Sequence, residues 1–391
     1  MPLSIPAVQG ALKEEGLDGW LLYDFHGSNP IARRLTGLDA GGKMTTRRWY
    51  YLIPVSGEPR KLMHAIEPYN LDHLPGGKTI YSQRETLTSG LKSVLGGLKR
   101  VAMEYSPSNA IPYISRVDAG TVEAVRALGA DVVSSGDLVQ RFEAVWSAEA
   151  VRTHRAASEA LYRIKDRAFE LVREHRRAGS PLTEIAVQRA MVGWFEDEGL
   201  VADAPPVVAA QENAGNPHYM PTDAKHRAIN AGEVVLLDLW GKLPSPGAVY
   251  ADITWVGFTG DPAEKYVKAF NAARDGRDAA VALVKARVAA GQEIRGFEVD
   301  RACRDVLERA GYGGQFIHRT GHSLGTEVHG NGVHMDDYET HDERRLIAGT
   351  GFTIEPGVYT PDFGVRTEIN MFVGDRDATV TGPLQTEFVK L

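Results

Sequence analysis

Short apolar runs alternate with amphipathic segments through the first 146 residues. The apolar runs have the length of buried strands, and the amphipathic segments carry apolar residues at helical spacing. The predicted strands are 20–23, 49–54, 101–104 and 132–133, and the predicted helices are 5–15 and 122–128. Strands that alternate with helices, separated by short Gly and Pro punctuation, predict an α/β domain.

The pattern changes near residue 146, where a long helical stretch begins. Ser147 is a typical N-cap residue, and apolar residues recur at helical spacing up to about Ala178. A second helix is expected from Ser180-Pro181, because proline favours the first helical position. We therefore predict an N-terminal domain of residues 1–146 and a second domain of residues 147–391.

Two strands of the second domain each carry an aspartate. Asp238 ends the apolar run 234–237, and Asp252 lies inside the run 249–254. The segment between the runs is rich in glycine and proline, so the two strands are expected to form an antiparallel hairpin. That pairing can bring both carboxylates to one place, although an acid at a strand end is more often exposed or a cap.

A short segment further along is rich in histidine and glycine. It contains His318, His322, His329, Gly321 and Gly325. Imidazole binds transition metals and transfers protons near neutral pH, and the glycines suggest backbone pressed close to a neighbour. A histidine-rich surface loop is the alternative. Two histidines beyond the segment are interpreted as surface residues: His334 and His341.

Two glutamates lie in apolar surroundings near the end of the sequence. Glu355 falls in the run 352–359 and Glu368 in the run 364–369, and each run is expected to be a strand with the glutamate at its middle. A buried carboxylate must be paired, protonated or bound to a metal. Arg366 points to the same strand face as Glu368 and could neutralise one of the two glutamates.

Together these motifs place four carboxylates and one imidazole on or beside strands of one domain. An oxygen-rich set with one nitrogen suits manganese, zinc, cobalt or iron, and bridging carboxylates favour a pair of ions. Two ions can activate a water and stabilise the charge that forms when it attacks a carbonyl. The sequence therefore predicts a hydrolytic site with two divalent metal ions per chain, manganese being the first candidate.

Composition and charge narrow the class of protein. The chain of 391 residues is 43% hydrophobic and 24% charged, which is ordinary for a globular protein, and its net charge of −7 argues against a nucleic-acid partner. We see no secretion signal and no apolar run of the length that a membrane span needs. Cys303, the only cysteine, is expected to be a buried structural thiol. These features predict a cytoplasmic protein without a membrane or nucleic-acid partner.

These motifs resemble those of the pita-bread metallopeptidases, which include methionine aminopeptidase, aminopeptidase P and prolidase. The likeness covers roughly residues 150–391, and the first domain resembles more loosely the N-terminal domain of aminopeptidase P, prolidase and creatinase. It implies an α/β N-terminal domain plus an α+β pita-bread C-terminal domain, in which helices cover a curved antiparallel sheet. It also implies five metal ligands, namely Asp238, Asp252, His322, Glu355 and Glu368.

The resemblance assigns further roles around the metal ligands. Glu355 matches the general base of the family, which accepts a proton when a metal-activated water attacks the scissile carbonyl. His218 matches a histidine near the substrate's amide, and His318 and His329 match substrate-binding or proton-shuttling positions that flank the metal histidine. His329 or His218 would hydrogen-bond the substrate carbonyl as charge develops. The resemblance also implies a homodimer.

The expected substrate is an Xaa-Pro dipeptide, as in prolidase. A dipeptidase must recognise a free carboxylate, and Arg366 is one candidate cation. Arg47 and Arg48 are others, because they follow a glycine-rich loop that begins at Gly41 and could reach a site, although an ordinary hairpin loop is the alternative. Only thirteen positions separate the two glutamates, which favours a compact dipeptide site over a long peptide groove.

Several alternatives share this scaffold. Aminopeptidase P would act on longer Xaa-Pro-Yaa peptides. A metal-free creatinase-like hydrolase or a non-catalytic binding module would be expected to have lost acidic ligands that this sequence retains. Methionine aminopeptidase is disfavoured by the extra N-terminal domain. Two departures from the family pattern affect specificity more than metal binding: fourteen positions separate Asp238 from Asp252, and Gly330 follows His329 where prolidases usually have an acid.

Overall fold

The computed structural model describes residues 3–39 and 44–391 of the chain. The chain folds as two units, Met1–Glu143 and Ala144–Leu391. The division therefore falls just before residue 147, where the long amphipathic stretch of the sequence begins.

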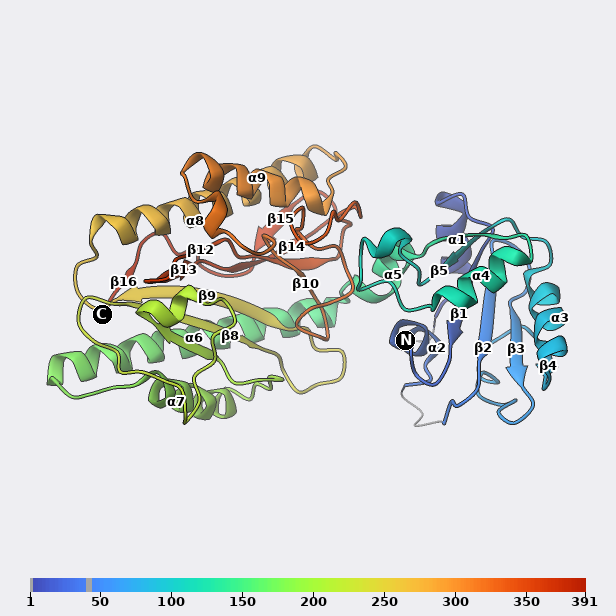
Figure 1. Ribbon diagram of the computed structural model, residues 1–391, viewed down its shortest axis with the longest axis horizontal. Coiled ribbons are helices and arrows are strands. Elements are labelled where there is room, and N and C mark those ends of the chain that lie inside the picture. Colours follow the sequence, from blue (N-terminus) through green and yellow to red (C-terminus); the bar gives the residue numbers. More distant parts are fainter. Residues whose placement is uncertain (1–2, 40–43) are drawn as a thin grey trace. The chain divides into compact units, whose positions relative to one another are not determined.

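A six-stranded mixed sheet forms the middle of the N-terminal unit, with strand order β4-β3-β2-β1-β5-β6 (Figure 1). Its strands are β1 Gly19–Asp24, β2 Trp49–Pro54, β3 Arg60–His64, β4 Gly77–Tyr81, β5 Arg100–Met103 and β6 Asp131–Ser134. β2 is antiparallel to both of its neighbours, and the other pairs are parallel. The four predicted strands correspond to β1, β2, β5 and β6. The edge strand β4 is mostly exposed and has no apolar run, so the pattern does not reveal it.

Helices cover both faces of this sheet, which explains why its central strands are apolar at successive positions. In β1, Trp20 and Leu22 face the core shared with α1, α2 and α5, whereas Leu21 and Tyr23 face the core shared with α3 and α4. The helices are α1 Ile5–Glu14, α2 Pro30–Thr36, α3 Arg84–Leu95, α4 Ala119–Ala127 and α5 Gly136–Val139, with a 3-10 turn at Pro107–Asn109 and a π-helical turn at Gln140–Ala144.

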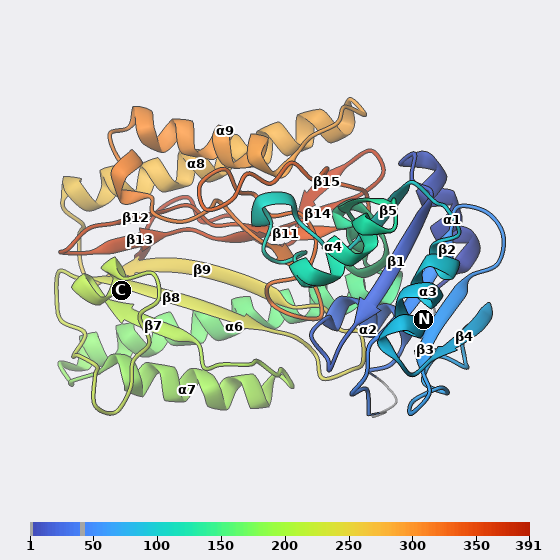
Figure 2. The same cartoon turned by 45° about the vertical axis from the view of Figure 1, so that its right-hand side comes forward.

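Two pairs of helices enclose the strands of the C-terminal unit (Figures 1 and 2). One pair is α6 Ala148–Ala178 and α7 Glu184–Asp197, and the other is α8 Glu264–Ala289 and α9 Gly296–Arg309. Ser147 caps α6 as predicted, because its side chain accepts a hydrogen bond from the Ala150 N–H. The predicted start of the next helix is wrong. Thr183 is the N-cap of α7, so Pro181 precedes the helix.

The strands between these helices form two four-stranded sheets and a two-stranded ribbon. The first sheet contains, in spatial order, β16 Val389–Lys390, β9 Ala251–Phe258, β8 Val234–Gly241 and β7 Val207–Ala210. The second sheet contains β10 Ser323–Leu324, β11 Gly351–Ile354, β14 Ile369–Val373 and β15 Ala378–Val380. The ribbon pairs β12 Gly357–Tyr359 with β13 Gly364–Arg366. Short 3-10 turns lie at Gln211–Gly215 and Gly313–Gln315.

The hairpin of β8 and β9 lies between two hydrophobic cores. Alternate residues of β8 face opposite ways: Val234 and Leu236 join the core with α8 and α9, and Val235 and Leu237 join the core with α6 and α7. Cys303 is buried in the first of these cores, as predicted. The two strands pair antiparallel along their whole length, so the predicted hairpin is confirmed.

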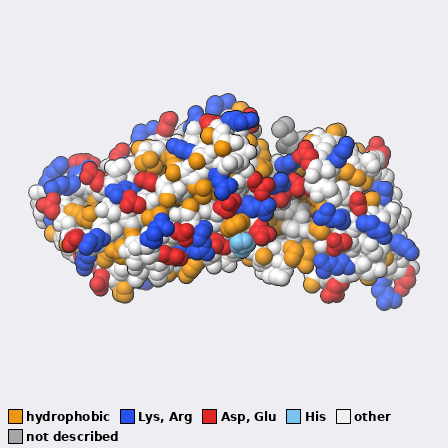
Figure 3. Space-filling view, turned by 90° about the horizontal axis from the view of Figure 1, so that it is seen from above, with side chains coloured by type: hydrophobic (Ala, Val, Ile, Leu, Met, Phe, Trp, Pro, Cys, Tyr) orange, Lys and Arg blue, Asp and Glu red, His pale blue; other side chains and the backbone are white. Residues whose placement is uncertain are grey.

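The surface carries charges of both signs. On the face that Figure 3 shows, the Lys and Arg side chains of each unit are interspersed with Asp and Glu side chains. That mixture differs from the clustered basic patch that binds nucleic acid. Within residues 3–39 and 44–391, no helix is long and apolar enough to cross a membrane.

Candidate metal centre

β8 and β9 carry the two predicted aspartates on one face of their hairpin. Asp238 lies opposite Thr254, and Asp252 lies opposite Trp240. Antiparallel partners share a face of the sheet, as does every second residue of a strand, so both carboxylates point to the same side. Asp252 is buried and Asp238 is partly exposed. The hairpin therefore presents both acids to the space beside β14.

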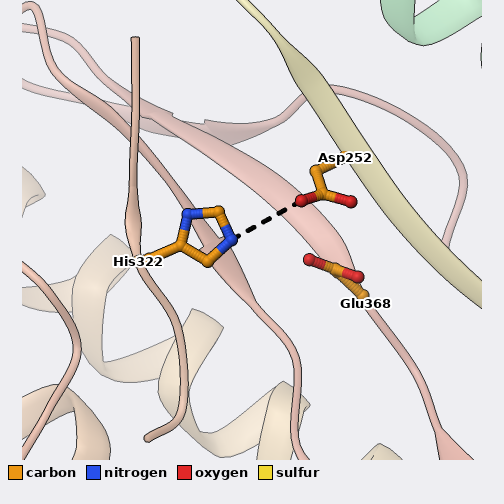
Figure 4. A group of neighbouring side chains, drawn as sticks. All are labelled: Asp252, His322 and Glu368. Atoms are coloured by element: carbon orange, nitrogen blue, oxygen red, sulfur yellow. Dashed lines mark ion pairs between the residues drawn. The ribbon is translucent and has the colours of Figure 1, made fainter. Parts of the chain in front are cut away.

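His322 directs one ring nitrogen toward the acids (Figure 4). Its Nδ1 lies 3.1 Å from the backbone oxygen of Ser323. A carbonyl oxygen only accepts hydrogen bonds, so Nδ1 carries the proton and Nε2 keeps a free lone pair. That Nε2 lies 3.5 Å from Asp252 Oδ2 and 3.5 Å from Glu355 Oε1. His322 is therefore held in the tautomer that a metal ligand needs.

Each predicted glutamate lies at a break between two short strands. Glu355 follows β11 and precedes β12, and Glu368 lies between β13 and β14. Their backbone N–H groups bond elsewhere: Glu355 donates to the Thr320 oxygen at 2.7 Å, and Glu368 donates to the Thr254 oxygen at 3.0 Å. The expectation of two continuous strands is therefore wrong, because the backbone changes its hydrogen-bonding partner at each glutamate.

Three buried side chains come together at this point. Asp252, His322 and Glu368 offer ligand atoms that all lie within 4.8 Å of one another (Figure 4). Among the described residues, Asp252 Oδ1 and Glu368 Oε1 are buried without a hydrogen-bond partner. A buried carboxylate oxygen without a donor is costly. Two such oxygens beside an imidazole lone pair fit a transition-metal cation.

Burial and mutual repulsion make these acids hard to ionise. Burial raises the pKa of Asp252 well above its ordinary range, and the Asp238 and Glu355 carboxylates raise it further. Burial also raises the pKa of Glu368 well above its ordinary range, with Asp252 the strongest charged contributor. A bound cation would reverse both shifts because it stabilises the ionised carboxylates. The electrostatics therefore agree with a cation site.

Arg366 and Thr254 connect the acids from one side. The Arg366 guanidinium forms an ion pair with Asp238 and donates from Nε to Thr254 Oγ1 at 2.8 Å. Thr254 donates its hydroxyl proton to Glu368 Oε2 at 2.6 Å. The direct ion-pair partner of Arg366 is therefore an aspartate of β8, while its charge also lowers the pKa of Glu368 against the larger effect of burial.

Of the remaining predicted histidines, His329 contacts a member of the cluster directly. The His329 ring packs edge-on against His322, with 4.3 Å between ring centroids. His318 donates from Nδ1 to a backbone carbonyl at 2.7 Å, so its Nε2 accepts the Tyr359 hydroxyl proton at 2.8 Å. His218 is exposed. The pKa of His329 is lowered to about 3, first by the neighbouring His322 and by burial, with a smaller contribution from His218.

Of the two histidines interpreted as surface residues, one is buried. His334 is 1% exposed, and its Nδ1 accepts the backbone N–H of Ser323 at 3.1 Å. It therefore supports the residue next to His322, and its predicted surface position is wrong. The turn that contains it has no apolar period that would signal burial. His341 is exposed, as predicted.

Arg47 and Arg48 belong to the N-terminal unit. Both are exposed, and both line a pocket of that unit. Residues 41–43 of the glycine-rich loop lie outside the described residues. The assignment of the two arginines to substrate binding stays a prediction.

Sequence reasoning missed three polar residues that hold the cluster together, namely Thr254, Thr353 and Asn370. Thr353 Oγ1 accepts the His322 N–H at 2.9 Å and donates to Glu355 Oε1 at 3.1 Å. Asn370 Oδ1 accepts a backbone N–H of β9 at 3.0 Å. Each of the three lies two positions from a predicted ligand. The two-residue period of extended chain would have found them, since it places such neighbours on one face.

The enclosed strands hold a cluster of acids around one histidine, an arrangement that fits a metal-dependent enzyme. Residues 152–375 match metallopeptidase family M24, which is more than half of the chain, and the chain belongs to this family. The Xaa-Pro dipeptidase of Lactobacillus helveticus is 34% identical over 163 residues, covering 41% of this chain and 40% of that protein. The Xaa-Pro dipeptidase of Lactobacillus delbrueckii subsp. lactis is 31% identical over 234 residues, covering 56% of this chain and 54% of that protein.

These matches span less than two thirds of either relative's length. A solved structure extends the likeness to both units. Dipeptidase PepE from Mycobacterium ulcerans superposes with a TM-score of 0.69 over 98% of this chain and 96% of that chain, at 24% identity. At that identity the likeness concerns the fold. The predicted fold class, an α/β unit followed by a pita-bread unit, is confirmed.

Proposed function

We propose that this chain hydrolyses Xaa-Pro dipeptides with the help of two divalent metal ions. The observation that carries the proposal is the pair of buried oxygens on Asp252 and Glu368 that have no partner among the described residues, beside the free lone pair of His322. The chain's membership of a metallopeptidase family supports hydrolysis of a peptide bond. The two relatives named Xaa-Pro dipeptidases support the choice of substrate.

The proposed metal ligands are Asp238, Asp252, His322, Glu355 and Glu368. When bound, divalent ions lower the pKa of water and polarise a carbonyl oxygen. Arg366 orients Asp238 through their ion pair, and Thr254 orients Glu368. Manganese is the first candidate, and zinc, cobalt and iron also suit this donor set.

The chain's own residues supply the proton transfers and the substrate contacts. Glu355 is the proposed general base: Thr353 holds one of its oxygens, and the side chain remains 14% exposed. His329 and His218 would hydrogen-bond the scissile carbonyl oxygen as negative charge develops on it. Tyr359 orients His318, which is proposed to contact the substrate.

The carboxylate of a dipeptide substrate needs a cation to bind it. Arg366 is buried and already bonded to Asp238 and Thr254, so we propose that it mainly positions the acids. Arg47 and Arg48 are exposed cations and remain proposed contacts for the carboxylate. We also propose a homodimer located in the cytoplasm.

A substrate panel assayed with each metal tests this function. We expect the metal-loaded protein to cleave Xaa-Pro faster than Xaa-Pro-Yaa and to contain about two metal equivalents per chain. Faster cleavage of the tripeptide would favour aminopeptidase P, and metal-replete protein without bound metal would favour a creatinase-like hydrolase or a binding module. His322→Ala and Glu368→Ala should lose metal and activity together. Full activity with full metal occupancy in either variant would contradict the assignment.

A further inference from the structure

The N-terminal unit has a pocket of about 920 Å³ between α3 and α4, at one end of its sheet. Four rings from neighbouring strands line it, namely Tyr23, Tyr50, His64 and Tyr81. The strand register pairs Tyr23 with Tyr50 and His64 with Tyr81, so the rings form a row across the sheet. A pocket of this size can enclose most of a small organic ligand.

Tyr50 brings an unused hydroxyl group to this pocket. Its side chain is only 2% exposed. The hydroxyls of its neighbours are occupied, because Tyr23 donates to Asp118 Oδ2 at 3.2 Å and Tyr81 donates to the Arg48 backbone oxygen at 2.7 Å. Within the described part of the chain, the Tyr50 hydroxyl has no hydrogen bond. The Tyr50 hydroxyl is therefore available to a ligand that enters the pocket.

Arg48 supplies an uncompensated positive charge beside that hydroxyl. Its charge acts on the Tyr23, Tyr50 and Tyr81 hydroxyls, each of which has its pKa lowered by this guanidinium against the larger effect of burial. No described carboxylate forms an ion pair with Arg48. Tyr81 holds the Arg48 backbone at the pocket through its hydrogen bond.

Asp118, the acid among the described lining residues, forms no ion pair with Arg48. Asp118 is the N-cap of α4, and its carboxylate accepts the Thr121 N–H at 2.9 Å and the Thr121 hydroxyl at 2.8 Å. A third donor, the Tyr23 hydroxyl, also bonds to it. Three arginines and one acid line the pocket, namely Arg47, Arg48, Arg84 and Asp118, so the net charge of the lining is positive.

Part of the remaining wall is apolar. It includes Phe25, Leu87, Leu91 and Leu128. We propose that this pocket binds a small carboxylate with an apolar body, whose charged end accepts hydrogen bonds from Arg48 and from the Tyr50 hydroxyl. Aromatic and aliphatic carboxylates share this chemistry. The site lies wholly within the N-terminal unit, and it gives Arg48 a role other than the dipeptide contact proposed above.

Calorimetric titration of the full-length, metal-loaded protein tests the proposal. The probes are 3-phenylpropionate and its amide, which has the same body without the charge. We expect saturable binding of the carboxylate and not of the amide. Arg48→Gln and Tyr50→Phe should each weaken the carboxylate about tenfold, because each removes a hydrogen bond to a charged group. Tyr50→Phe removes only an oxygen without a partner, so folding and peptidase activity should be unchanged.

Arg84→Gln is the matched control for charge. Arg84 also lines the pocket, but it already pairs with Glu85 at 3.1 Å, so its loss should change the affinity by less than about twofold. The proposal is overturned if the carboxylate does not bind, if the amide binds equally well, or if Tyr50→Phe does not weaken binding. A carboxylate bound at the metal centre would produce the last result. If Arg84→Gln weakens carboxylate binding as much as Arg48→Gln does, or if inorganic phosphate binds equally tightly, the pocket is a general anion site. Either result would also overturn the proposal.

Discussion

Thr254 places a single hydroxyl among three charged side chains. Its oxygen accepts Arg366 Nε at 2.8 Å, lies 2.6 Å from Glu368 Oε2, and lies 3.3 Å from Asp238 Oδ1. A hydroxyl has one proton, and the shorter contact shows that Glu368 receives it. Thr254 thereby orients Glu368 so that the other carboxylate oxygen faces His322 and Asp252.

Replacing this hydroxyl should weaken metal binding more than it disturbs the fold. Thr254→Val keeps the side-chain shape and removes the hydrogen bond, so we expect metal affinity to fall about ten- to hundredfold, with activity recovering at high metal concentration. Thr254→Ser keeps the hydroxyl and should bind metal nearly as the wild type does. Metal titrations followed by activity measure both. Unchanged affinity in the valine variant would remove Thr254 from this role.

Glu104 is a buried acid of the N-terminal unit without a cation. Its carboxylate accepts hydrogen bonds from Trp20 Nε1 at 2.7 Å and from Asn29 Nδ2 at 2.7 Å, but burial raises its pKa from 4.5 to about 7. The folded chain therefore holds this proton while the unfolded chain has lost it. Stability must fall as the pH rises from about 4.5 to about 7, by up to about 3 kcal/mol from this group, and then level off.

Infrared difference spectra can follow this proton directly. Wild type minus Glu104→Gln should show a protonated-carboxyl band that disappears with a midpoint near pH 7, and the wild type should lose more stability than the variant between pH 5 and pH 7. Glu123→Gln, on the exposed side of α4, is the control and should leave the pH dependence unchanged. If the band is absent at pH 5, Glu104 is ionised in the folded protein and the expected slope disappears.

At the scale of elements, the sequence predicts which strands carry the acids but not where those strands break. The apolar runs around Glu355 and Glu368 indicate extended chain, and extended chain is present. The pattern does not indicate which residue accepts the backbone N–H of each glutamate. The acceptor is the Thr320 oxygen for Glu355 and the Thr254 oxygen for Glu368. Both partners come from distant parts of the sequence, and local propensity carries no information about them. The same limit explains why the sequence does not reveal Asp238 as the ion-pair partner of Arg366.

Gly321 lies where two segments of backbone approach closely, as the sequence indicated. A Cβ on Gly321 would lie 2.0 Å from the Thr353 oxygen, so the backbone before β10 can approach β11 only at a glycine. Gly325, from the same segment, has no neighbour closer than 3.7 Å to such a Cβ. The expectation of close backbone approach is therefore right for Gly321 and wrong for Gly325.

The two glycines make a matched pair of variants. Gly321→Ala should force β10 from β11, cost about 1–3 kcal/mol and displace His322, so both melting temperature and metal content should fall. Gly325→Ala should change neither by much, because its Cβ meets only ordinary contacts. Thermal unfolding and elemental analysis measure the two effects. Equal behaviour of the two variants would mean that the close approach to Thr353 has no energetic consequence.

For the whole molecule, the order of motifs was more informative than any single motif. Composition excludes little, and each acid has an ordinary explanation when taken alone. The sequence indicates the hairpin and the histidine segment because both are local patterns. The burial of His334 and the pocket around Tyr50 depend on contacts between distant segments, so they emerge only from the folded chain. Arg48 is an example. Its sequence context suggests a binding role, and the structure places it in the same pocket wall as Tyr50 and Tyr81.

The acid cluster also makes a prediction about the stability of the two units. Without a cation, Asp252 and Glu368 are buried with partnerless oxygens, so metal binding should stabilise the C-terminal unit selectively. At a metal concentration a hundred times the Kd, linkage contributes about 3 kcal/mol. Hydrogen exchange measured by mass spectrometry, before and after chelation, should show faster exchange in β8, β9 and β11, with β1 and β5 of the N-terminal unit as the internal control. Equal acceleration in both units, or in neither, would mean that the cluster does not couple metal binding to the folding of its own unit.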